Sequence, residues 1–245
     1  MGGSRNFYEK YFVELEISAE EKLKQLWRVE LLQRATSWLP EVEKGLFVGI
    51  GKGLELEARV EEAFTVGLDL PFTYLPMIKN NLEDENVAIL QGDGTKLPFD
   101  DDTFDYILCS EVLEHVPNRA DMISEYARVL KPGGHVIITT PNWISCYGLA
   151  RKLVELISRR DIHADDQPLD KWITLGSLKS EFGSHFEIEK SRGFWYYPPI
   201  GRGSFQILPG IFSVLWRILK PFERLNSALF PGLGHCVLIY GKVKK

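Results

Sequence analysis

The residues best suited to bind a ligand are three closely spaced glycines, Gly49, Gly51 and Gly53, and an aspartate that follows the next apolar run. Because glycine has no Cβ, this stretch can turn tightly and let the backbone approach a ligand closely. Asp69 ends the run Thr65–Asp69, where a carboxylate can accept hydrogen bonds from both hydroxyls of a ribose. For the glycines alone, an ordinary glycine-rich turn is the alternative interpretation.

A second acidic segment, Gly92–Phe99, supplies groups that suit a nucleobase. The carboxylate of Asp93 can accept from an exocyclic amine, and the amide of Gly94 can donate to a ring nitrogen. Single acidic residues of this kind are more often turn or cap residues. Three such features in one order, each after an apolar run, favour a nucleoside-binding site.

The elements that must position these residues alternate between short apolar runs and helical segments. The runs are Leu46–Gly49, Thr65–Asp69, Val87–Gly92, Tyr106–Ser110 and His135–Thr140. Continuous apolar strands separated by helices predict a parallel sheet covered on both faces, with ligands at the carboxyl ends of the strands. The helix that follows the glycine turn is expected over roughly Leu54 to Phe64. The amides at its start would face an electron-rich group such as a carboxylate.

The next segments along the chain make the pattern more specific. Together they resemble a class I S-adenosylmethionine-dependent methyltransferase of the ubiquinone-biosynthesis-like group, also called methyltransferase type 11. The matching segments are Val48–Gly53, Gly67–Asp69, Gly92–Phe99, Phe104–Ile107, Val112–Val116 and Arg128–Gly134, which follow the family's order over about Gly45 to Asn142.

This resemblance implies a Rossmann-like, doubly wound α/β fold. Its sheet would have seven strands, mostly parallel, with helices on both faces and an antiparallel last strand. Phe186–Lys190 and Cys236–Val243 are the two late strands expected.

The resemblance also implies a set of residues that hold S-adenosylmethionine. They are Gly49, Gly51 and Gly53 beneath the methionine part, Asp69 at the ribose with Leu70 beside it, Asp93 and Gly94 at the adenine, and Ser110 and Glu111 on the methionine side. One position departs from the family. Phe47 stands two residues before the first glycine, where the family has an acidic residue that helps hold the methionine amino group.

The candidate catalytic residues are His115 and Glu114, in the turn after the fourth strand. A general base is needed only if the acceptor must lose a proton early, so His115 holding the turn is the alternative. Pro141, Asn142 and Trp143, just past the fifth strand, are better placed to form walls of the substrate pocket.

We expect residues 1–245 to form a single domain. Residues 1–40 are predicted as an N-terminal helical lid, 41–142 as the cofactor-binding core, 143–184 as a helical insertion near the acceptor, and 185–245 as the last two strands with an apolar insertion over about 195–232. Ser18 and Glu21 form a capping-box signal for the lid helix, whose apolar face carries Leu23, Leu26, Trp27 and Leu31.

The apolar insertion is too short and too interrupted by proline to span a bilayer. Packing in the core or in a homodimer is one interpretation. A pocket for an apolar acceptor or a peripheral membrane contact is the other.

Composition narrows the class of protein. Of 245 residues, 44% are hydrophobic and 26% charged, which is typical of a globular chain with a sizeable core. The net charge of −5 disfavours a nucleic-acid partner, which would need a local basic patch.

Cys109, Cys146 and Cys236 lie far apart, so we interpret them as buried thiols in a reducing compartment. The N-terminus lacks an apolar signal core, and we expect a cytoplasmic protein, with membrane association left open.

Two other kinds of site are disfavoured. A dinucleotide dehydrogenase needs a glycine at position 54, which is leucine here. The run Asp161–Asp166 offers oxygen and nitrogen ligands without an established spacing, so we expect no metal.

The favoured function is in-line methyl transfer from S-adenosylmethionine to a small or lipid-like acceptor, such as a quinone, lipid, isoprenoid or lipid-linked glycan. A non-catalytic cofactor-binding or interaction protein, and a protein or RNA methyltransferase, are the alternatives.

Overall fold

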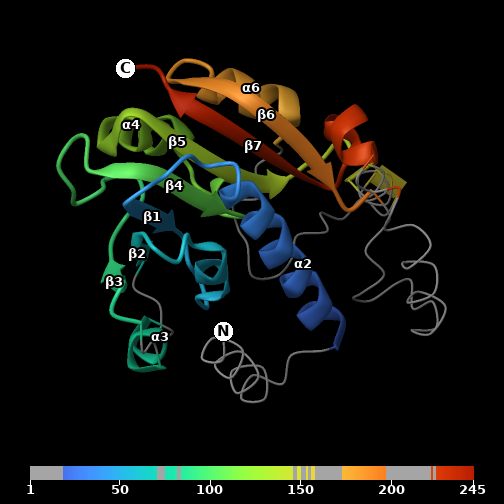
Figure 1. Ribbon diagram of the computed structural model, residues 1–245. Helices are drawn as coiled ribbons and strands as arrows, with labels where there is room; N and C mark the ends of the chain where they lie inside the picture. The colour runs from blue at the N-terminus through green and yellow to red at the C-terminus, as the bar shows by residue number, and fades with distance from the viewer. Residues whose placement is uncertain are drawn as a thin grey trace.

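The computed structural model contains one seven-stranded sheet with strand order β3-β2-β1-β4-β5-β7-β6 (Figure 1). It describes residues 19–70, 75–81, 84–145, 148–149, 153, 156–157, 173–196, 222 and 225–245. The strands are β1 (Lys44–Val48), β2 (Phe64–Asp69), β3 (Val87–Gln91), β4 (Phe104–Ser110), β5 (Leu130–Pro141), β6 (Phe186–Phe194) and β7 (Cys236–Val243). The first five run parallel, and β7 is antiparallel to both of its neighbours. The predicted fold, including the antiparallel last strand, is confirmed.

Helices cover both faces of this sheet. The α-helices are α2 (Ala19–Thr36), α3 (Leu75–Asn81), α4 (Arg119–Val129) and α6 (Leu175–Phe182), and the 3₁₀ helices are η1 (Leu54–Ala58), η2 (Leu113–His115) and η3 (Pro231–Leu233). One core cluster joins α4 and α6 to the sheet, and the second joins α2, η1 and α3 to the opposite face. Figure 1 shows α2, in blue, lying across the sheet on the second face. Alternate residues of β1 enter the two clusters, which explains why the central strands are apolar throughout.

The helix predicted over Leu54 to Phe64 is wrong. Only the five residues of η1 are helical, and β2 already begins at Phe64. The connection must return along the length of the sheet in few residues, and a 3₁₀ helix rises about 2.0 Å per residue against 1.5 Å in an α-helix. Arg59 then continues in extended conformation, with φ −65° and ψ 155°. The argument from amides at the start of an α-helix therefore does not apply after the glycine turn.

Parts of the predicted lid and insertions lie outside the described residues. This holds for residues 1–18 with the predicted cap Ser18, for the side chains of Leu23, Leu26 and Trp27, for Cys146, and for residues 158–172 and 197–221. Within the described part, α2 begins at Ala19 and packs Leu32 and Ala35 into the second cluster. Cys109 and Cys236 are free and buried. No helix among the described residues is long and apolar enough to cross a membrane.

An arginine clamps the loop between β3 and β4 onto α4. The Arg128 guanidinium donates to both carboxylate oxygens of Glu125, at 2.7 and 2.9 Å, and to the backbone carbonyls of Leu97 and Phe99. It also pairs with Asp101 at 2.8 Å. The amide of Leu97 donates to the same Glu125 carboxylate at 2.7 Å. The segment that follows Asp93 and Gly94 is thus fixed by two side chains of α4, Arg128 and Glu125.

We predict that Arg128→Met lowers the free energy of unfolding by about 1–2 kcal/mol, because charged hydrogen bonds are lost and two loop carbonyls lose a donor. Urea unfolding measures this loss. The matched control is Arg34→Met, at an exposed position of α2, which should change the midpoint little. Equal effects of the two substitutions would contradict the clamp.

The same variant should show a defined pH dependence. The hydrogen bond from Arg128 lowers the pKa of Glu125 below its ordinary value of 4.5. A lowered folded-state pKa contributes stability that is present above the unfolded pKa and lost as pH falls through the folded one. The stability difference between wild type and Arg128→Met should therefore be constant above about pH 5 and shrink below pH 4.5. A difference independent of pH down to pH 3 would argue against the Glu125 contribution.

Candidate active site

The glycine turn leaves β1 in the left-handed conformation that only glycine adopts without strain. The φ angles of Gly49, Gly51 and Gly53 are 76°, 50° and 86°. A Cβ at Gly49 would stand 2.2 Å from Val112 Cγ2, so this glycine is also required by packing. A Cβ at Gly51 would meet no atom of the described residues within 4 Å. The middle of the turn therefore faces open space in this part of the chain.

Asp69 lies directly beside this turn. The amide of Gly51 donates to its Oδ2 at 2.6 Å, and the amide of Leu70 donates to its Oδ1 at 2.7 Å. The residue is only 7% exposed. Burial raises the pKa of the carboxyl, and the two amide hydrogen bonds lower it by less. Each oxygen keeps a second lone pair that can accept from a ligand hydroxyl.

The two residues predicted to hold the adenine differ in exposure. Asp93 is exposed, and its Oδ1 accepts from the amide and the hydroxyl of Thr95, both at 2.8 Å, as in an Asx turn. Gly94 is buried, and a Cβ there would stand 2.5 Å from Met122 Cε and 2.8 Å from Val48 Cγ1. The structure thus places Gly94 against the end of β1 and Asp93 on the surface beside it.

The end of β4 brings two predicted cofactor residues next to β5 and β7. Ser110 is buried and accepts from the Thr139 hydroxyl at 2.9 Å. Glu111 has a φ of 55°, and its amide donates to the Thr139 carbonyl at 3.0 Å. The Cys236 thiol donates to Glu111 Oε1 at 3.1 Å. Burial and the nearby Glu111 carboxylate raise the pKa of that thiol, so it stays protonated as a donor.

The candidate catalytic pair lies on η2, just beyond Glu111. Glu114 is 4% exposed, and its Oε2 accepts from the Thr140 hydroxyl at 3.1 Å. Its Oε1 lies 3.7 Å from Nε2 of His115. The His115 side chain remains 34% exposed. The structure therefore brings an accessible imidazole together with a buried carboxylate.

The three predicted wall residues differ in what they do. Pro141 pairs with Cys236 in the sheet, and Trp143 is buried. Asn142 is 1% exposed, and its amide nitrogen donates to the carbonyls of Gly232 and Gly234, each at 2.8 Å. Its Oδ1 is buried and has no partner among the residues that the structure describes. Asn142 thus holds η3 against the end of β5.

Phe47 does not lie at the ligand edge. It is 1% exposed, belongs to the second core cluster, and its ring packs edge-to-face on Tyr106 with centroids 6.0 Å apart. A carboxylate at this position would enter an apolar cluster.

Two charged residues that sequence analysis missed lie near the glycine turn. Arg28 of α2 places Nη2 3.3 Å from Oε1 of Glu55 in η1, and Glu55 is 8% exposed. The carboxylates of Glu111 and Glu114 are close enough to raise the pKa of Arg28. The available signal was an acidic residue two positions after the last glycine, but only the fold shows that an arginine meets it.

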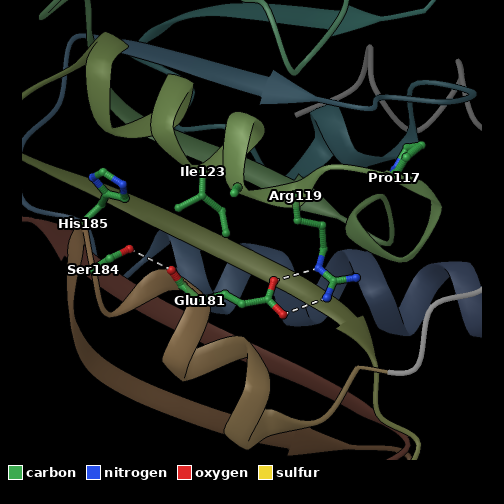
Figure 2. Close-up of a pocket in the computed structure, with 7 residues that line it drawn as sticks. Pro117, Arg119, Ile123, Glu181, Ser184 and His185 are labelled. Atoms are coloured by element: carbon green, nitrogen blue, oxygen red, sulfur yellow. Dashed lines mark hydrogen bonds and ion pairs between the residues drawn. The ribbon is translucent and has the colours of Figure 1, made fainter.

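A separate cavity of about 250 Å³ lies between α4 and α6 (Figure 2). It is lined by Pro117, Arg119, Ala120, Ile123, Glu181, Ser184 and His185. Arg119 spans it with two 2.7 Å hydrogen bonds to Glu181. It shares no residue with the glycine turn. No group of three or more His, Cys, Asp or Glu among the described residues could hold a metal ion, and Asp161–Asp166 lies outside them.

Comparison with known proteins agrees with this geometry. A family profile described as a methyltransferase domain matches residues 46–138, from β1 into β5. The demethylmenaquinone methyltransferase of Staphylococcus saprophyticus is 35% identical over 96 residues, covering 36% of this chain and 41% of that protein. The Bacillus cereus enzyme of the same name is 39% identical over 84 residues, covering 33% and 35%. The matched region thus spans about two-fifths or less of the length of these relatives.

Solved structures extend the likeness in fold to nearly the whole chain. An S-adenosylmethionine-dependent methyltransferase from Thermotoga maritima has a TM-score of 0.61 at 17% identity, covering 92% of this chain and 98% of that one. One from Mesorhizobium loti has a TM-score of 0.58 at 19% identity, covering 85% and 95%. Residues 46–138 thus match a methyltransferase domain, and the fold of the chain is that of the class I methyltransferases. The two solved structures are described as S-adenosylmethionine-dependent.

The site of this protein fits S-adenosylmethionine in two respects. The turn is open at Gly51, where a side chain would intrude, and the buried Asp69 carboxylate beside it has acceptor capacity left. Acidic groups from η1 and the end of β4 suit a cofactor that carries a sulfonium and an ammonium.

An acidic residue at position 47, as in the family, should destabilise this protein. We predict that Phe47→Asp lowers the free energy of unfolding by more than about 3 kcal/mol, because a buried ring is lost and a carboxylate enters an apolar cluster. Urea unfolding tests it against Phe64→Asp, whose ring is 40% exposed and should cost less than about 1 kcal/mol. An unchanged midpoint for Phe47→Asp, or tighter cofactor binding, would contradict the burial argument.

Proposed function

We propose that this methyltransferase transfers a methyl group from S-adenosylmethionine to a small, lipid-like acceptor of the quinone, lipid, isoprenoid or lipid-linked glycan type. The observation that carries the proposal is the open glycine turn at Gly51, joined by a hydrogen bond to the buried Asp69, at the same sheet edge as Glu114 and His115. The bound cofactor would supply an electrophilic methyl group on its sulfonium. The protein then has to align the acceptor in line and exclude water.

The residues that would hold the cofactor form three groups around the turn. Gly49, Gly51 and Gly53 would lie beneath its methionine part, with Ser110 and Glu111 at the end of β4 on the same side. Asp69, next to Leu70, would accept from the ribose hydroxyls. Asp93 and Gly94 would lie at the adenine, where the exposed Asp93 forms the outer edge.

His115 is the group proposed to take a proton from the acceptor. Its imidazole is partly accessible, and Glu114 behind it is buried and oriented by the Thr140 hydroxyl. The Glu114 carboxylate, with Oε1 3.7 Å from Nε2 of His115, would position the imidazole.

A lipid-like acceptor is supported by apolar side chains after β5 and before β7, both at this sheet edge. Ile144, Leu149, Leu153, Leu156 and Ile157 after β5, and Phe222, Leu225, Leu229, Phe230 and Leu233 before β7, are 49–74% exposed. Leucines and phenylalanines so exposed in one region suit an apolar partner. The named relatives act on demethylmenaquinone, a substrate of this chemical kind.

Cofactor binding can be tested at the open glycine. We predict that Gly51→Ala weakens binding of S-adenosylhomocysteine at least 10-fold in calorimetry, because the new methyl group enters the proposed site and touches no protein atom. Gly133→Ala is the matched control. Gly133 also has a positive φ, 83°, and its Cβ would have no atom nearer than 3.6 Å. Both variants should lose similar stability, and equal binding by both would refute the site.

The proposed base is tested by His115→Gln. We expect turnover of a short-chain demethylmenaquinol to fall at least 10-fold at neutral pH while the affinity for S-adenosylhomocysteine stays unchanged, because only proton removal is affected. His185→Gln, in the cavity between α4 and α6, is the control. Full turnover by His115→Gln would exclude a base at this position. No turnover by the wild type on quinol, lipid or isoprenoid acceptors, with the cofactor bound, would leave a non-catalytic binding protein.

A further inference from the structure

The methyltransferase lacks the acidic residue of strand β1, yet its ligand edge contains a buried acidic side chain from another element. Glu55 lies on η1, two residues after Gly53, and its side chain is 10% exposed. Burial raises the pKa of its carboxyl and Arg28 lowers it, while Glu111 and Asp69 are close enough to raise it further. Glu55 therefore lies on the element that follows the glycine turn, within electrostatic reach of Asp69, which ends β2, and of Glu111, which follows β4.

Arg28 is held in the same place by the packing of α2. Leu32, one helical turn later on the same face, is fully buried in the second core cluster. The side chain of Gln33 donates to the Glu57 carbonyl at 2.9 Å, which ties α2 to η1 at a second point. The Arg28 side chain is 24% exposed. Its guanidinium position is therefore set by the helix and not by a loop.

The charges around Arg28 keep it protonated. Burial lowers the pKa of the guanidinium, but the carboxylate of Glu55 first, and then those of Glu111 and Glu114, raise it above its ordinary value. The ion pair with Glu55 is a single 3.3 Å contact and not a bidentate one. A guanidinium has five N–H donors in a planar fork that suits a carboxylate, so this geometry leaves it able to bind another one.

We propose that Arg28 and Glu55 bind the amino-acid end of S-adenosylmethionine, with Arg28 pairing with its carboxylate and Glu55 with its ammonium group. This rests on the proposed function, because it assumes that the glycine turn holds the cofactor. A buried acid and a partly buried arginine held together match a zwitterion, which provides one partner for each charge. Glu55 thus takes over, from η1, the task that the acidic residue of β1 has elsewhere in the family.

The test compares two nucleosides that differ in this end alone. S-adenosylhomocysteine carries the amino acid, whereas 5′-methylthioadenosine lacks it. In calorimetry the wild type should bind S-adenosylhomocysteine more tightly. We expect Arg28→Met to lower the affinity for S-adenosylhomocysteine at least 10-fold and to leave the affinity for 5′-methylthioadenosine within 2-fold of the wild-type value. The reason is that a charged hydrogen-bonded pair is lost from one ligand only. Arg34→Met, the same change at an exposed position of the same helix, should preserve the ratio of the two affinities.

A second variant distinguishes a loss of binding from a loss of folding. Arg28→Met leaves Glu55 buried without its cation, so Arg28→Met/Glu55→Gln, which removes both charges, is measured alongside it. It too should bind 5′-methylthioadenosine normally and lose the preference for S-adenosylhomocysteine. If either variant binds 5′-methylthioadenosine and keeps the wild-type ratio, the inference is overturned while the proposed function stands. If the wild type binds neither nucleoside, the proposed function itself fails, and this inference with it.

Discussion

The site depends on one hydrogen bond, from the amide of Gly51 to the carboxylate of Asp69. It joins the ends of two neighbouring strands at 2.6 Å, and its acceptor is almost fully buried. The bond requires Gly51 to keep a positive φ, and Gly49 must lack a side chain so that Val112 can pack over the turn. The local geometry of the turn, the burial of Asp69 and the position of η2 are therefore consequences of one another.

The sheet could be predicted because the apolar runs that indicate its strands are local and recur along the chain. Each central strand is an uninterrupted apolar run, since residues on both faces are buried, and all seven expected strands are present. Asp69 and the glycines were found for a similar reason, because they follow these runs directly. Their predicted contacts with a cofactor remain a proposal.

What could not be predicted depends on distances through space. The α-helix expected after Gly53 is a short 3₁₀ helix, because the length of the sheet to be crossed is not visible in local propensity. The ion pair of Arg28 and Glu55 joins α2 to η1, the element that follows the glycine turn. No rule of sequence spacing connects the two residues. The hydrogen bond from the Asn142 amide to the backbone of η3 joins residues ninety positions apart, and no local pattern predicts it.

The strand order also constrains how the chain folds. β6 precedes β7 in sequence, yet in the sheet it pairs with β7 alone, and β7 fills the place next to β5. On a ribosome that releases the chain from its N-terminus, β6 lacks its native partner strand until residues 236–243 have emerged. Until then β5 presents an unpaired edge to solvent, which is the kind of edge that invites pairing with another chain. The order of synthesis therefore leaves the edge of β5 open to pairing with another chain until β7 emerges.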